Sequence, residues 1–86
     1  MNIESEEIFK GKTVSFSCGL DTLGIKNVSF KTIQDKKFVI GDIPLSATKD
    51  DLALDKACGV SWDSVTDFMV FDTEKEYSDW IEANEI

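Results

Sequence analysis

The stretch "TVSFSCG", residues 13–19, decides the fold class, because apolar and polar side chains alternate along it. Val14, Phe16 and Cys18 fall on one side of an extended chain, and the hydroxyl residues between them fall on the other. A period of two residues is typical of a strand that buries one face. The sequence therefore predicts a strand here, with Val14 and Phe16 turned toward a core.

Further extended segments follow this pattern along the chain. "VSFKTI" (28–33) and "KFVIGDI" (37–43) flank a polar turn and predict a hairpin with lysines at its tip. The preceding residues 20–27 contain the breaker Gly24, so we predict a loop there. The continuous apolar run "DFMVF" (67–71) predicts one more strand, covered on both faces.

The first of two predicted helices covers residues 48–58, before that last strand. Thr48 and Asp51 have the three-residue spacing of a capping box. A narrow apolar stripe follows within the segment, and Gly59 fits the position just after a helix end. This segment is therefore predicted as a short amphipathic helix.

The second predicted helix lies in "FDTEKEYSDWIEANEI" (71–86) and starts at Thr73. Tyr77, Trp80 and Ile81 fall on one helical face, so we predict that all three belong to the core. The side facing away from the core carries the carboxylates Glu76, Asp79, Glu82 and Glu85.

We predict an α+β fold from this order of elements. It is a small single domain of residues 1–86, with a mainly antiparallel sheet of about four strands and two helices packed on one face. The order is β-β-β-α-β-α. Residues 1–12 form an N-terminal segment whose attachment to the domain the pattern leaves open.

The missing residue types narrow the possible functions. The chain has no histidine and no arginine, so the commonest general acid–base and the bidentate phosphate-binding side chain are both absent. Cys18 and Cys58 lack a Cys-x-x-Cys spacing and are predicted to be free buried thiols. Asp50, Asp51 and Asp55 do not have the spacing of a calcium loop. We expect no enzymatic activity, no metal and no cofactor.

Charge is distributed unevenly along the chain. The formal net charge is −8, and residues 44–86 carry all of it, with eleven acids and three lysines. An acidic surface repels nucleic acid and attracts basic proteins, so we expect no direct nucleic-acid binding. The predicted partner-binding residues are Asp50, Asp51, Asp55, Trp62, Glu74, Glu76, Asp79, Glu82 and Glu85. For the carboxylates the alternative is an ordinary solvated surface, and for Trp62 it is a lid over the core.

The location of the protein is a further expectation. The N-terminus is acidic and lacks a secretory signal, and no apolar run is long enough to span a membrane. We therefore expect a cytoplasmic protein that does not bind membranes, in the host cytoplasm if a phage encodes it.

These features together resemble the class of small acidic phage-encoded proteins that block host enzymes. The resemblance implies an inhibitor that covers the basic, nucleic-acid-binding surface of a partner such as a nuclease, in its strongest form as a DNA mimic. Two alternatives remain open at this point. One is an antitoxin- or immunity-like plug of one enzyme's active site, and the other is an assembly subunit that homo-oligomerises.

Overall fold

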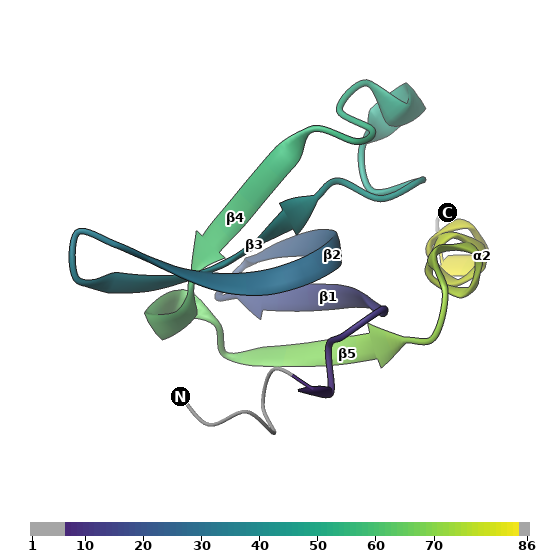
Figure 1. Cartoon of the computed structure of the whole chain (residues 1–86). Helices are drawn as coiled ribbons and strands as arrows, with labels where there is room; N and C mark the ends of the chain where they lie inside the picture. Colours follow the sequence, from purple (N-terminus) through teal and green to yellow (C-terminus); the bar gives the residue numbers. More distant parts are fainter. Residues whose placement is uncertain (1–6, 85–86) are drawn as a thin grey trace.

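Five antiparallel strands and one α-helix make up the part of the protein that the computed structural model describes, residues 7–84 (Figure 1). The strands are β1 (Thr13–Cys18), β2 (Asp21–Ile33), β3 (Lys36–Asp42), β4 (Ala57–Ser61) and β5 (Asp67–Phe71). They form one sheet in the order β4-β3-β2-β1-β5. The 3-10 turns η1 (Lys49–Asp51) and η2 (Trp62–Ser64) precede β4 and β5, and the helix α2 (Glu74–Asn84) follows β5. The α+β class is confirmed, with one strand more and one helix fewer than predicted.

The long strand β2 is shared between two halves of this sheet. Its first part pairs with β1, from Asp21 to Lys26, and its second part pairs with β3, at Lys26 and again from Ser29 to Ile33. The register shifts between Lys26 and Ser29. A bulge of this kind bends a strand and increases its twist. The two halves can therefore enclose a core, although the chain is short.

The core lies inside this bend. Val14 and Phe16 are fully buried, which confirms the prediction made from their alternation. Phe9, from the segment before β1, is 1% exposed and lies edge-on to Phe16, with ring centroids 5.5 Å apart. Phe9 also packs edge-on against Phe68 at 5.0 Å. One aromatic side chain thus joins the segment before β1 to both β1 and β5.

The predicted helix over residues 48–58 is wrong. Only η1 is helical there, turns follow it, and β4 begins at Ala57. Asp50, Asp51 and Asp55 have φ angles of 54°, 53° and 66°. This left-handed conformation cannot continue a right-handed helix, and aspartate adopts it more readily than most residues.

The predicted loop over residues 20–27 is also wrong, because β2 begins at Asp21. Gly24 lies inside this strand rather than in a turn. The Tyr77 ring occupies the space that a Cβ atom at Gly24 would need, with the Tyr77 Cζ atom 2.7 Å from that position. The glycine therefore allows a close approach of α2, as glycines inside strands often do.

The strand at 67–71 is confirmed, but the prediction that both its faces are covered is wrong. Phe68, Met69 and Val70 are 40%, 45% and 38% exposed, and only Phe71 is buried. The strand lies at the edge of the sheet. Neighbouring elements cover an edge strand less completely than a central one.

The C-terminal helix is confirmed, and the Thr73 hydroxyl accepts the Glu76 backbone N–H at 3.0 Å. Tyr77 is 2% exposed, as its helical face predicted. The core assignment of Trp80 is wrong, because this side chain is 38% exposed and covers Phe71 from outside, with ring centroids 5.5 Å apart. Within residues 7–84 no helix is both long and apolar enough to cross a membrane.

Candidate functional site

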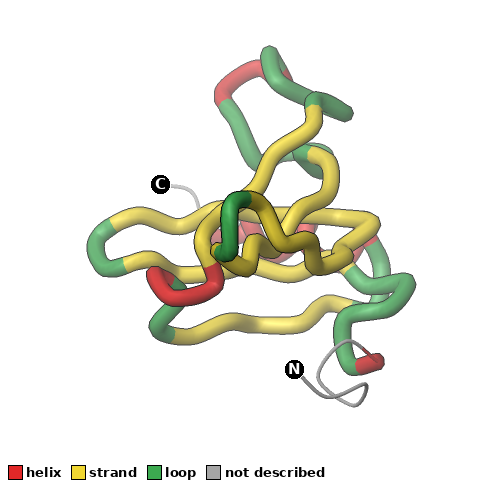
Figure 2. Tube along the Cα trace, turned by 60° about the vertical axis from the view of Figure 1, so that its left-hand side comes forward, coloured by secondary structure: helices red, strands yellow, loops and turns green. Residues whose placement is uncertain are grey.

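Two segments far apart in the sequence bring most of the predicted carboxylates to one side of the molecule. Figure 1 shows the β3–β4 connection, which carries η1, on the same side of the molecule as α2, and Figure 2 shows this connection projecting from the sheet. We call this region the acidic end, and its carboxylates are those of Asp50, Asp51, Asp55, Glu74, Glu76, Asp79 and Glu82. Glu85 lies outside the described residues. The lysines on these segments or in contact with them are Lys26, Lys49, Lys56 and Lys75. Seven carboxylates against four lysines leave an excess of three negative charges.

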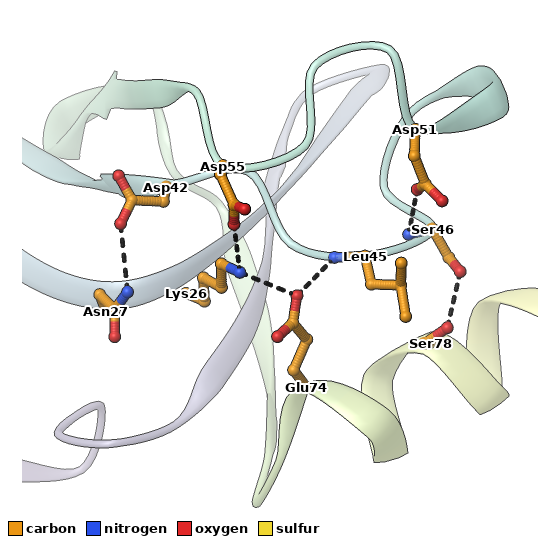
Figure 3. A network of polar contacts seen from close by, with 9 residues as sticks. All are labelled: Lys26, Asn27, Asp42, Leu45, Ser46, Asp51, Asp55, Glu74 and Ser78. Carbon is orange, nitrogen blue, oxygen red and sulfur yellow. Dashed lines mark hydrogen bonds and ion pairs between the residues drawn. The ribbon is translucent and has the colours of Figure 1, made fainter.

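Lys26 joins three elements at the centre of the acidic end (Figure 3). Its ammonium lies 2.6 Å from an Asp55 carboxylate oxygen and donates to Glu74 at 3.0 Å. Glu74 also accepts the backbone N–H of Leu45 at 2.7 Å. The Lys26 side chain is 19% exposed. The close Asp55 carboxylate, and next the hydrogen bond to Glu74, raise the pKa of Lys26 above its usual 10.5, against the opposing effect of burial.

Ser46 links the β3–β4 connection to the middle of α2. Its hydroxyl lies 2.6 Å from the hydroxyl of Ser78, which is 3% exposed, and donates to Glu82 at 3.2 Å. Its backbone N–H donates to Asp51 at 2.7 Å. Asp51 therefore accepts a backbone hydrogen bond within the β3–β4 connection, and it does not form a helix-capping box with Thr48. These bonds hold Asp51 and Glu82 in fixed positions.

The remaining carboxylates of the acidic end differ in how firmly they are held. Asp79 pairs with Lys75 at 2.8 Å on the exposed side of α2. Glu76 accepts the backbone N–H of Asp72 at a long 3.4 Å. Asp50 is exposed and has no hydrogen bond or ion pair to any other described residue. A carboxylate with one hydrogen bond still has lone pairs for a second donor, so all these groups can receive a cation from outside.

A cleft of about 1070 Å³ separates the η1 segment from the C-terminal half of α2. Ala47 and Ile81 contribute apolar surface to it. Asp50, Asp51 and Glu82 contribute carboxylates, and Lys49 contributes one positive charge. An extended lysine or arginine side chain has the matching chemistry, with an apolar stem and a cationic head.

Trp62 does not join this site. It lies in η2, before β5, whereas α2 follows the far end of the same strand (Figure 1). Its ring packs edge-on against Phe30 at 5.3 Å and against Phe9 at 6.5 Å. Trp62 is half-buried, and its contacts are those of a lid over the core.

Three residues that organise the acidic end were not predicted from the sequence, namely Lys26, Ser46 and Ser78. Ser78 borders the apolar stripe of α2, and a polar residue at such a border is a weak signal of a buried contact. Lys26 and Ser46 give no signal, because the partners of their side chains lie more than 25 residues away.

Metal binding has no visible site in this part of the molecule. Within the residues that the structure describes, no three histidine, cysteine, aspartate or glutamate side chains are grouped so that they could hold a metal ion. Asp50, Asp51 and Asp55 lie close together in the sequence, but Asp51 accepts the Ser46 backbone N–H and Asp55 pairs with Lys26. Comparison with known proteins gives no match to a family model, to a curated protein or to a solved structure.

Proposed function

We propose that the protein is a small acidic inhibitor that binds a basic surface of another protein through its acidic end. The observation that supports this most is the convergence of two separate segments into one region with three excess negative charges. A surface that only keeps a protein in solution has no need to be assembled from segments some 20 residues apart. The electrostatic field of such a region attracts a basic partner and speeds its association.

The internal hydrogen bonds of the acidic end support binding further. Asp51, Asp55, Glu74 and Glu82 are held before any partner arrives. Binding to fixed groups costs less side-chain entropy than binding to mobile ones. The cleft between η1 and α2 adds a place where one basic side chain of the partner can enter.

The partner would be a nucleic-acid-binding protein such as a nuclease, because its basic surface is built to receive a row of negative charges. In the strongest form of this proposal, the carboxylates imitate the phosphates of a duplex. Under this proposal the protein acts by binding alone, without catalysis or a cofactor. It would act in a cytoplasm, as a phage protein that inhibits a host enzyme would. An immunity-like plug of a single active site is a narrower version of the same proposal.

A capture experiment with two matched triple variants tests the proposal. Asp50→Asn, Glu76→Gln and Asp79→Asn remove three charges from the acidic end and preserve shape. Asp21→Asn, Asp35→Asn and Asp63→Asn remove three exposed charges elsewhere. Proteins retained from a cell lysate at 0.05 M salt are identified, and their activity is titrated with each form of the protein.

We expect the first triple variant to lose a retained basic partner at least tenfold, while the second retains it like the parent. Retention should fall steeply by about 0.5 M salt, where screening acts within a few Å. The parent should also inhibit the captured protein's activity. Equal binding by both variants, or a partner that resists salt, would show that the acidic end is an ordinary solvated surface.

A further inference from the structure

Strand β5 leaves an open edge of the sheet, at the lower side of Figure 1. It pairs with β1 on one side and is last in the strand order. Within residues 7–84, no strand pairs with its other side. The outward backbone N–H and C=O groups of an edge strand can pair with another extended chain.

Three of the usual protections against such pairing are missing from this edge. Natural edge strands are often guarded by lysine, proline or a bulge. The segment 67–71 has no lysine and no proline, and its pairing with β1 runs without a register shift. As far as residues 7–84 are concerned, strand β5 is therefore open to strand addition along its whole length.

Apolar side chains lie on both faces beside the edge. Phe68 and Val70 stand opposite Phe16 and Val14, so they face the core side. Met69 lies on the other face, with Phe71. Phe68, Met69 and Val70 are each between 38% and 45% exposed. An extended chain that pairs with this edge would contact apolar side chains of β5 on both faces of the sheet.

We propose that β5 receives an extended segment of a partner protein by strand addition, and that this segment is apolar with a basic residue at each end. The negative charges at the two ends of β5 indicate which kind of segment would bind there. Asp67 begins the strand, and Asp72 follows it with a side chain that is 74% exposed. Asp72 also pairs with Lys12 at 2.9 Å, but a carboxylate can accept from two cations.

The two other possible occupants fit this charge pattern less well. A second copy, added antiparallel, would bring its own Asp67 and Asp72 to the ends where the first copy has Asp72 and Asp67. Each copy also carries a net charge of −8. The chain's own residues 1–6 include Glu4 and Glu6, which have the wrong sign as well. Charge complementarity therefore selects a basic segment from a different protein.

This inference rests on the proposed function and makes it more specific. The acidic end would attract a basic partner, and β5 would fix its orientation by main-chain hydrogen bonds and apolar contacts, as in other cases of strand addition. The partner would then have an exposed extended segment or strand edge beside its basic surface.

Short synthetic peptides can test the edge directly on the full-length protein. The probe is an end-blocked heptapeptide with a lysine at each end and alternating valine and threonine between them. One control peptide has glutamate at both ends, and another has proline at the central position. Binding is measured by titration, and hydrogen exchange of the backbone amides locates the site. Met69→Lys places a charge in the middle of the edge, and Leu20→Lys makes the same change in a fully exposed turn.

We expect the lysine-ended peptide to bind and to slow amide exchange in β5, and the glutamate-ended and proline peptides to bind at least tenfold more weakly. Met69→Lys should weaken binding at least tenfold, and Leu20→Lys less than twofold. The double variant Asp67→Lys and Asp72→Lys should reverse the preference in favour of the glutamate-ended peptide.

Several outcomes would overturn the proposal. They are no binding of the lysine-ended peptide, equal binding by Met69→Lys, binding without protection of β5, and concentration-dependent dimerisation through this edge. Peptide binding that occurs only after deletion of residues 1–6 would identify that segment as the natural occupant instead. The proposed function can hold even if strand addition at β5 is refuted. In that case the captured partner should bind Met69→Lys as tightly as the parent, and its binding should still depend on the acidic end.

Discussion

Replacing Lys26 with methionine should destabilise the protein far more than replacing any surface lysine. Methionine keeps most of the aliphatic stem and removes the charge that joins β2, the β3–β4 connection and α2. The contact with Asp55, whose side chain is 68% exposed, is worth roughly 0.2–1 kcal/mol. The bond to the less exposed Glu74 is worth about 1.5–2 kcal/mol, since hydrogen bonds to charged groups are among the stronger ones. The loss is therefore about 2–3 kcal/mol, or roughly 10–20 °C in melting temperature for a domain of this size.

Lys75→Met is the matched control for this experiment. Lys75 also contacts an aspartate at 2.8 Å, but its side chain is 83% exposed, and we expect no measurable change in stability. Thermal unfolding of the parent and both variants is followed by circular dichroism at pH 7. Adding Glu74→Gln to Lys26→Met should recover part of the loss, because it removes an uncompensated carboxylate. A similar small shift for Lys26→Met and Lys75→Met would refute the view that Lys26 organises the acidic end.

Three further predictions concern the contact between α2 and the sheet, and the effect of high pH. Gly24→Ala should cost about 1–3 kcal/mol by overpacking, and Tyr77→Phe should recover part of this in the double variant, as chemical unfolding would show. Trp80→Ala should lower the free energy of unfolding by about 2 kcal/mol, less than the roughly 3–5 kcal/mol of a buried aromatic, because Trp80 is 38% exposed. A loss as large as that of Tyr77→Ala would contradict this prediction. Burial raises the pKa of Cys58 above 9.0 and that of Tyr77 above 10.0, so the unfolded state releases these protons first. The free energy of unfolding should therefore decline as the pH rises from about 9 to 11, and it should decline less steeply in Tyr77→Phe. A denaturant midpoint that stays constant over this pH range would contradict the raised pKa values of Cys58 and Tyr77.

Local patterns in the sequence predicted the elements whose signals are local. The alternation around Phe16 identified β1, the polar turn after Ile33 identified the β2–β3 hairpin, and Thr73 marked the start of α2. Each of these signals depends on residues within a few positions of one another. Backbone preference and side-chain period agree in those segments.

The segment 48–61 was misread because its local signals conflict. Thr48 and Asp51 have helix-capping spacing, but the aspartates adopt left-handed turns. Cys58 and Val60 alternate over too few residues to outweigh an apparent helical stripe. Only the pairing of residues 57–61 with β3 makes the end of this segment a strand, and the partner strand is not visible in the segment itself.

The candidate site was predictable in composition but not in architecture. The outward carboxylates of α2 follow from helical periodicity, and Glu76, Asp79 and Glu82 are indeed exposed. Their connection to the η1 segment depends on Ser46 and Lys26, which contact residues distant in sequence. The exposure of Trp80 likewise depends on its contact with Phe71 of the edge strand β5, and that contact is not visible in the helical pattern.

The position of β1 between β2 and β5 has a consequence for the order of folding. Strands β1 to β4 are each paired with their neighbour in sequence, so this meander can form through short loop closures. The pairing of β1 with β5 joins residues from near opposite ends of the chain, and such closure is slower because more chain entropy must be lost. We expect β5 and α2 to dock last and to open first, with the fastest amide exchange among the regular elements. Refolding from denaturant would then pass its rate-limiting step when the two ends of the chain meet.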